Sequence, residues 1–166
     1  MGLNPKWLSP EQFKNAVDLL PLVSIDLCVI CGEKMLLGNR NNRPAKNWLF
    51  TPGGRIKKSE PIEIAIQRIC LEEINYPSLR RDQVVLMGAW DHFYTDSAFD
   101  KDISTHYINL PHYFSINQEK KESFDLSKGQ CEQHSSWTWM PVKEASIHSH
   151  VHPYVREYAL WLLDNT

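Results

Sequence analysis

One amphipathic helix pattern, preceded by two adjacent glycines, sets the strongest limit on how this chain folds. The segment Pro52-Gly53-Gly54 ends a strand-like run, and a helix pattern then covers residues 59–74. At about 100° per residue, Ile62, Ile66 and Ile69 form one apolar stripe along that helix. A stripe of this kind has to be covered by another element, and the neighbouring strand-like runs supply a sheet. The pattern therefore predicts a helix packed on a β-sheet.

An acidic residue falls within the same stripe. Glu73 projects about 20° from Ile62, so its carboxylate points with the isoleucines toward the sheet. A buried carboxylate without compensation costs several kcal/mol. Two interpretations follow: either the helix frays at its end and Glu73 turns to water, or a divalent cation with oxygen ligands compensates the charge.

The order of the remaining elements indicates a mixed fold of the α+β type. Strand-like runs occupy residues 22–30, 34–38, 48–51, 84–93, 104–115 and 136–140, and helix patterns occupy residues 10–20, 59–74 and 153–163. Ser9, Pro10 and Gln12 form a capping signature for the first helix, and Pro21 ends it. The charge-rich segment 117–130 is expected to be a surface loop or edge excursion. We predict a mixed α/β sandwich and not a doubly wound sheet.

Length and charge limit the class of protein. A chain of 166 residues with 42% hydrophobic residues is expected to form a single domain, 1–166, with residues 1–20 as an N-terminal helical extension. Lys and Arg number 18 against 20 Asp and Glu, which argues against a nucleic-acid surface and leaves only local anion sites. No apolar run approaches a membrane span and no secretory signal opens the chain, so we expect a cytoplasmic protein that binds no membrane.

Two cysteines have the spacing of a metal or redox site. Cys28 and Cys31 form a C-x-x-C pattern. They lie in a strand-like run, where positions three apart face opposite sides of a sheet, and no second pair of matching spacing follows. We therefore expect no metal or redox site at these cysteines.

The segment 51–58 has the composition of a phosphate and metal site. Its two glycines allow the backbone to approach a ligand closely, and Arg55, Lys57 and Lys58 supply positive charge. Taken alone, the same residues also fit an ordinary turn with solvated lysines. A fixed spacing favours the site, because acidic and basic residues recur at set intervals after the glycines. These are Gly54, Glu60, Arg68, Glu72 and Glu73.

In this spacing the chain resembles the Nudix hydrolase family, whose box places Gly, Glu, Arg and a Glu-Glu pair at these positions. The resemblance implies a Nudix-type mixed β-sheet sandwiched between helices. Two positions depart from the box. Asn75 replaces a glycine, which is mild because Asn tolerates the left-handed conformation that ends a helix. Ile69 replaces a glutamate that helps bind metal in members that cleave a phosphoanhydride, which argues for fewer metals or different chemistry.

The second departure is shared with the GDP-mannose mannosyl hydrolase branch, which the chain resembles well beyond the box. The matching segments are 21–26, 36–40, 42–45, 52–55, 90–94, 105–107 and 132–134. This resemblance implies Mg²⁺-dependent hydrolysis of GDP-mannose or GDP-glucose to GDP and free hexose, by water attack on the anomeric carbon with inversion. Two alternatives stay open: a pyrophosphohydrolase that gives GMP and a sugar 1-phosphate, favoured by Glu72 and opposed by Ile69, and a non-catalytic nucleotide-binding domain.

The resemblance also implies roles by position, together with a homodimer and a GDP-hexose substrate. One Mg²⁺ per subunit, replaceable by Mn²⁺, would be held by the Gly53 carbonyl, Glu73 and Gln133. His134, which is otherwise an ordinary loop histidine ahead of a strand, would be the general base. The other assigned residues would contact the substrate: Arg40 and Arg55 at the diphosphate, Tyr107 as a donor to it unless it simply packs in the core, Asp26 at the charge that develops on the sugar, and His92 at the sugar or nucleobase.

Overall fold

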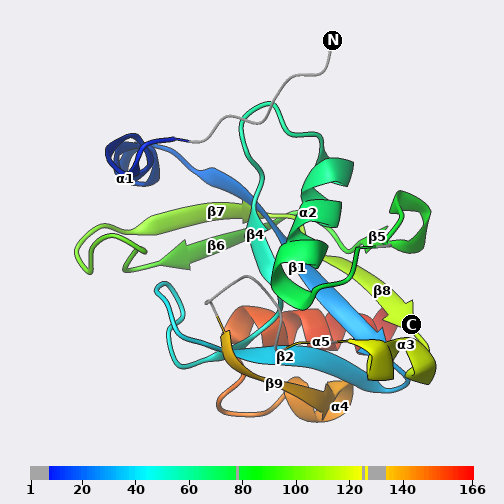
Figure 1. The fold of residues 1–166 in the computed structure, drawn as a ribbon. Helices are drawn as coiled ribbons and strands as arrows, with labels where there is room; N and C mark the ends of the chain where they lie inside the picture. Colours follow the sequence, from blue (N-terminus) through cyan, green and yellow to red (C-terminus); the bar gives the residue numbers. More distant parts are fainter. Residues whose placement is uncertain (1–7, 78, 125, 127–133) are drawn as a thin grey trace.

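The computed structural model of the chain describes residues 8–77, 79–124, 126 and 134–166 (Figure 1). Its elements in chain order are α1 (Pro10–Leu19), β1 (Leu22–Cys31), β2 (Lys34–Arg40), β3 (Leu49–Phe50), β4 (Gly53–Arg55), α2 (Ile62–Ile74), the short 3-10 helix η1 (Arg81–Gln83), β5 (Val85–Leu86), β6 (Trp90–Tyr94), β7 (Thr105–Asn109), β8 (His112–Ile116), α3 (Gln118–Ser123), β9 (His134–Pro141), α4 (Val142–Ala145) and α5 (Pro153–Asn165). Within these described ranges, no helix combines the length and apolar character that crossing a membrane requires.

The long strand β1 joins the two halves of the sheet. As far as Asp26, β1 pairs with β4 in antiparallel and with β7 in parallel orientation. From Leu27 onward it pairs with β8 in parallel orientation and, at its end, with β2 in antiparallel orientation. β6 extends the first half beside β7, while β9, β3 and β5 extend the second half. The parallel partner of β1 therefore changes from β7 to β8 between Ser24 and Leu27, and the antiparallel partner changes from β4 to β2 between Asp26 and Ile30.

Helices cover both faces of this mixed sheet. Alternate residues of β1, such as Ile25 and Leu27, pack with Ile66 of α2 in one core cluster. Cys28 faces the other way and joins a second cluster with Val155 of α5. Figure 1 shows α2 and α5 on opposite sides of the strands. The predicted α+β class, a mixed sheet between helices, is confirmed.

Several local predictions are also confirmed. Ser9 caps α1 through a complete capping box with Gln12. Cys28 and Cys31 belong to opposite core clusters, as the strand alternation predicts. Asn75 ends α2 in the left-handed conformation, with φ of 52°. In each case the relevant constraint is local, so short-range sequence patterns are sufficient to predict it.

Two predicted strands are wrong in extent, because each is interrupted. The run 84–93 is divided into β5 and β6 around Gly88, whose φ of 149° lies in a region that L side chains rarely adopt. The run 104–115 is divided into β7 and β8 at Leu110 and Pro111, and proline lacks the N–H that a continuous ladder needs. Each division lets the chain move to a different position in the sheet.

Other predictions need correction at element ends and in loops. Ile62, the reference for the predicted stripe, is 44% exposed because it is the first residue of α2; the buried face begins at Ala65. The glycine segment contributes a strand, β4, and is not only a turn. The segment 117–130 includes the helix α3, capped by Asn117, so the loop prediction is wrong there. Segment 142–145 forms α4, which no sequence pattern predicted.

An ion-pair network ties the segment before α2 to the helix itself. The Nε and Nη2 atoms of Arg68 donate to the two carboxylate oxygens of Glu60 at 2.6 and 2.9 Å. Nη2 also donates to the Arg55 carbonyl, and Nη1 donates to Glu72, both at 2.8 Å. The side chain of Glu60 is 1% exposed. Burial alone would raise the pKa of Glu60, but the hydrogen bonds from Arg68 and from the Lys57 N–H outweigh it and lower that pKa.

This network predicts that Arg68→Met destabilises the fold. The substitution leaves the Glu60 carboxylate buried without its guanidinium, and we expect the free energy of unfolding to fall by about 3–5 kcal/mol. Chemical denaturation at neutral pH measures this loss. Arg80→Met is the matched control, since Arg80 pairs with Asp82 at the surface, and its midpoint should not move. Glu60→Gln combined with Arg68→Met should recover part of the loss; equal midpoints for Arg68→Met and wild type would contradict a stabilising role of Arg68.

Candidate active site

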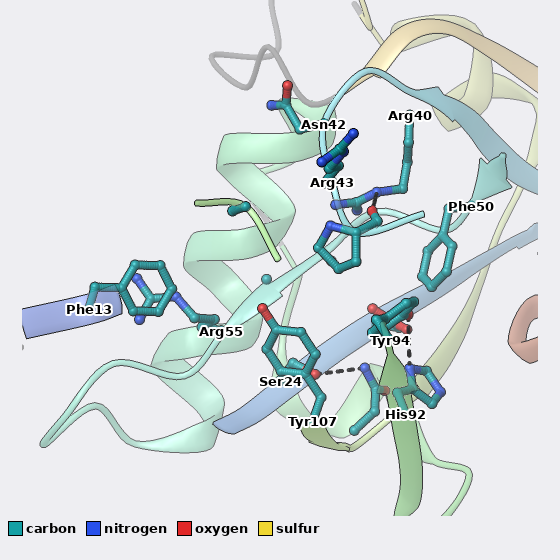
Figure 2. A pocket seen from close by; sticks show the side chains of 16 residues that line it. Phe13, Ser24, Arg40, Asn42, Arg43, Phe50, Arg55, His92, Tyr94 and Tyr107 are labelled. Atoms are coloured by element: carbon teal, nitrogen blue, oxygen red, sulfur yellow. Dashed lines mark hydrogen bonds between the residues drawn. The ribbon is translucent and has the colours of Figure 1, made fainter. Parts of the chain in front are cut away.

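A cavity of about 310 Å³ opens where β1 changes its neighbours. Figure 2 shows side chains from several elements converging on it. It is lined by Phe13, Ser24, Asp26, Arg40, Asn42, Arg43, Pro44, Phe50, Gly53, Gly54, Arg55, His92, Tyr94, Ala98, Tyr107 and Asn109. The structure therefore brings together six residues that the sequence assigned to a site: Asp26, Arg40, Gly53, Arg55, His92 and Tyr107.

Asp26 supplies a buried carboxylate to this cavity. It is 5% exposed and pairs across the ladder with Gly53, where an added Cβ would lie 2.3 Å from Asp26 Oδ1. Only glycine therefore fits beside this carboxylate. The pKa of Asp26 is raised from 3.8 to about 6, chiefly by burial and also by the charge of Glu73, while hydrogen bonds from Tyr158 and Asn109 and the charge of Arg40 offset part of the rise.

The other carboxylate oxygen of Asp26 reaches a buried polar cluster. Tyr158 of α5 donates its hydroxyl to Asp26 Oδ2 at 2.8 Å. The same hydroxyl lies 2.9 Å from His92 Nε2 and 3.2 Å from Asn109 Oδ1. Asn109 in turn donates to the Ser24 hydroxyl at 2.8 Å. The carboxylate is thus held by groups from β1, β6, β7 and α5.

His92 lies deeper in the cavity wall than its predicted role suggested. It is 1% exposed, its ring stacks on Tyr154 with 3.8 Å between centroids, and Nδ1 lies 3.5 Å from the Tyr94 hydroxyl. Burial lowers the pKa of His92 to about 3, and nearby His152 adds to this. His92 is therefore neutral at physiological pH, and its assignment to the sugar or nucleobase stays a prediction.

Two arginines approach the cavity from different sides. Arg55, from β4, places its guanidinium 3.5 Å from the centroid of the Phe13 ring of α1. Arg40, at the end of β2, donates from Nε to the Pro44 carbonyl at 3.1 Å and lies over Phe50. Figure 2 shows Arg55 with Phe13 on one side and Arg40 near Phe50 on the other. These contacts orient both planar donor groups before any ligand arrives.

The charges of the Arg55 and Arg40 guanidinium groups both act on the phenol of Tyr107, on β7. Burial raises the pKa of Tyr107, and the charges of Arg55 and Arg40 offset only part of that rise. Its phenol is therefore protonated at neutral pH and is a hydrogen-bond donor at the cavity wall. Burial also lowers the pKa of Arg55, yet a guanidinium remains cationic under these conditions.

Glu73 and His134 form a second group, outside the described lining of the cavity. Glu73 is 4% exposed, so the interpretation that it turns to water is wrong, and α2 continues one residue beyond it. His134 Nδ1 lies 3.4 Å from Glu73 Oε2, and the His134 side chain is 1% exposed. Neither ring nitrogen of His134 has a hydrogen-bond partner among the described residues.

His134 opens β9 and does not lie on the loop that precedes it, which corrects its predicted place. It pairs with Arg40 across the ladder. Its ring lies against Trp137, with centroids 4.6 Å apart, and over Gly38, where an added Cβ would lie 2.5 Å from the ring. The absence of a side chain at Gly38 therefore provides the space that the imidazole occupies. Gln133, the predicted neighbouring ligand, lies outside the described residues.

The donor groups near Glu73 fit a hard divalent cation. Glu73 offers a buried carboxylate, and the Gly53 carbonyl adjoins Asp26 in the ladder. The charge of Glu73 acts on Asp26, so the two carboxylates lie close enough to interact, and oxygen groups of this kind are the ligands that a hard divalent cation prefers. Within the described part of the chain, no three His, Cys, Asp or Glu side chains gather as a ready-made metal cluster.

Sequence reasoning missed Tyr158, Asn109 and Phe13. Tyr158 looked like one of several apolar positions in the last helix pattern, and nothing local distinguishes it from a core tyrosine. Phe13 belongs to the N-terminal helix, which the sequence treated as an extension, although it lines the cavity beside Arg55. Asn109 lies inside the predicted run 104–115, and only the division of that run into β7 and β8 places it at a strand end.

The raised pKa of Asp26 predicts how Asp26→Asn changes stability with pH. Below 3.8 the carboxyl is protonated in folded and unfolded chains; between about 4 and 6 only the unfolded chain ionises, so wild type loses stability as pH rises. Above pH 6 the loss is complete, at about 3 kcal/mol. Asp26→Asn should therefore be the more stable form at pH 7.5, by up to that amount, in metal-free buffer. The difference should fall below about 1 kcal/mol at pH 4, as followed by thermal unfolding; a pH-independent difference would contradict the assignment.

Comparison with known proteins places this geometry in a family. A family model described as the NUDIX domain matches residues 21–162. The chain is 29% identical over 148 residues to the low-salt glycan biosynthesis protein Agl8 of Haloferax volcanii, covering 89% of this chain and 86% of that one.

Solved structures agree in fold. The MutT protein from Methanosarcina mazei Go1 has a TM-score of 0.67 at 15% identity, covering 88% of this chain and 96% of that one. A bifunctional NMN adenylyltransferase/ADP ribose pyrophosphatase from Francisella tularensis, solved with AMP and an Mn ion, has a TM-score of 0.60 at 20% identity, covering 87% of this chain and 41% of that one. The glycine segment and α2 lie where the sequence predicted them, and the family model covers most of the chain. The chain therefore belongs to the Nudix family.

Proposed function

We propose that this Nudix protein hydrolyses a GDP-hexose, with GDP-mannose as the first candidate, to GDP and free hexose. The observation that carries the proposal is the composition of one cavity, in which Arg40, Arg55 and Tyr107 share the lining with the buried carboxylate of Asp26. Two guanidinium groups and a phenol donor suit the oxygens of a diphosphate. A single carboxylate in the same cavity suits positive charge that develops on a sugar.

The choice of bond follows from Ile69. The Nudix box has a metal-binding glutamate there in members that attack phosphorus, whereas Ile69 is 1% exposed and belongs to the core cluster under α2. The Ile69 side chain packs closely on Gly54, where an added Cβ would lie 3.2 Å from it. Glu72, which favoured the alternative cleavage, pairs with Arg68 at 2.8 Å. These contacts favour attack at the sugar carbon.

In the proposed reaction, each of these residues has a separate role. Arg40, Arg55 and Tyr107 bind the diphosphate and stabilise the negative charge that grows on it as the bond to the anomeric carbon breaks. Asp26 stabilises the positive charge on the sugar. His134 accepts a proton from the attacking water, whose oxygen bonds to the anomeric carbon while GDP departs with the electron pair.

Glu73, the Gly53 carbonyl and Gln133 are the residues we assign to a divalent cation, with Mg²⁺ preferred for an all-oxygen set. When bound, the cation neutralises diphosphate charge and makes GDP a better leaving group. A structural relative that carries an Mn ion supports a divalent metal in this fold. The Agl8 relative supports a glycan-related substrate, since its name refers to glycan biosynthesis.

Hydrolysis of GDP-mannose in water labelled with heavy oxygen tests the bond that breaks. With Mg²⁺ present we expect the label in mannose and unlabelled GDP, because water attacks carbon. Mass spectrometry of the separated products measures this. Label in a phosphate, with GMP and mannose 1-phosphate as products, would establish the pyrophosphohydrolase alternative. Absence of turnover on every nucleotide sugar tested would instead favour a binding domain.

Substitution of Glu73 and His134 tests their proposed roles. We expect Glu73→Gln to lower turnover by about a thousandfold, because it removes the charged ligand, and His134→Ala to lower it by about two to four orders of magnitude. Circular dichroism should show both variants folded. Glu63→Gln on the exposed first turn of α2 and His150→Ala on an exposed loop are the matched controls. Near-normal rates for both Glu73→Gln and His134→Ala would refute the assignment.

A further inference from the structure

The hydroxyl of Tyr158 is the centre of a buried hydrogen-bond cluster, called the hub below, and the proposed reaction assigns it no role. The side chain is fully buried, and its hydroxyl lies 2.8 Å from Asp26 Oδ2, 2.9 Å from His92 Nε2 and 3.2 Å from Asn109 Oδ1. These three partners come from β1, β6 and β7, whereas Tyr158 comes from α5. One phenol oxygen therefore links four elements directly below the cavity.

The donors and acceptors of this hub can be assigned one by one. Asp26 Oδ2 and Asn109 Oδ1 both only accept hydrogen bonds, and the single proton of Tyr158 is assigned to Asp26 because Oδ2 lies nearer, at 2.8 against 3.2 Å. The phenol oxygen can then only accept from His92, which must carry its proton on Nε2. In a neutral imidazole Nδ1 is left as an acceptor, and the Tyr94 hydroxyl lies 3.5 Å from it. The hydrogen bond from Tyr158 to Asp26 thus selects one tautomer of His92.

Packing holds this chain of hydrogen bonds in place. The Tyr158 ring contacts Trp90 at 4.7 Å between centroids, and the His92 ring stacks on Tyr154 at 3.8 Å. Tyr154 and Tyr158 are one turn apart on α5, so a single helix face supports both partners. On the opposite side, Asp26 Oδ1 lies against Gly53. Each oxygen of the carboxylate is therefore confined by a different element.

We propose that Tyr158 is a positioning residue that holds the Asp26 carboxylate toward the cavity and fixes the tautomer of His92. The inference rests on the proposed function in one respect, since Asp26 is the group assigned to the charge on the sugar. Tyr158 itself is not placed against the substrate. Its effect is transmitted through Asp26, and it acts on the transition state, where that charge develops.

Tyr158→Phe tests the kinetic part, because it keeps the ring and removes only the hydroxyl. With Mg²⁺ and GDP-mannose we expect kcat to fall about 10- to 100-fold while KM changes less than about threefold. Adding Tyr158→Phe to Asp26→Asn should slow turnover little further, since both act through one carboxylate. Tyr113→Phe is the matched control: Tyr113 packs on Trp161 of the same helix, away from the hub, and the substitution should leave kcat unchanged.

A second measurement separates this inference from the proposed function. Nitrogen chemical shifts of the His92 ring at pH 8 should show the Nε2–H tautomer in wild type and loss of that preference in Tyr158→Phe. This readout needs no substrate, so it tests the hub even if wild type hydrolyses no GDP-hexose. An Nδ1–H tautomer in wild type, or an unchanged kcat in a folded Tyr158→Phe protein that is otherwise active on GDP-mannose, would overturn the inference.

Discussion

The change of neighbours along β1 around Asp26 is the constraint on which the rest of this structure depends. Before that point β1 pairs with β4 and β7, and after it with β8 and then β2. On one side β4 stays paired with β1 as far as Asp26, whereas the pairing with β7 ends at Ser24 and the pairing with β8 begins at Leu27. Asp26 therefore lies between two successive partner strands, lines the cavity there, and is approached closely by its ladder partner Gly53.

Burial at this point makes charge placement the central energetic problem. The net charge of the chain is only −2, yet charges of both signs gather in one region. Arg40 and Arg55 line the cavity, and the carboxylates of Asp26 and Glu73 are buried. Arg68 neutralises Glu60 internally and leaves the cavity arginines to a ligand. Burial raises the pKa of Asp26, and the neutral hydrogen bonds that hold its carboxylate lower it only in part. The charges that stabilise the fold, such as those of Arg68 and Glu60, are therefore distinct from the arginine charges that line the cavity.

Periodicity predicted those elements whose patterns are local. The capping box of α1, the buried face of α2 including Glu73, and the alternation of β1 are all visible in short windows of sequence. The divisions at Gly88 and Pro111 were missed because hydrophobic alternation continues across them, while the chain changes its position in the sheet. The site was predicted mainly through spacing and family resemblance. These identified residues of the cavity lining but not the residues that hold them in place, such as Tyr158.

The sequence by itself determined the family box, the buried carboxylate of α2, and the replacement of a ligand position by Ile69, because these depend on residue type and spacing along one chain segment. Only the tertiary structure decided what surrounds Asp26. Tyr158 lies 132 positions away in sequence and His92 is 66 positions from Tyr158, yet one hydroxyl joins them. Hydrogen-bond geometry between distant segments depends on how α5 packs against the separated halves of the sheet, and no local pattern encodes that packing.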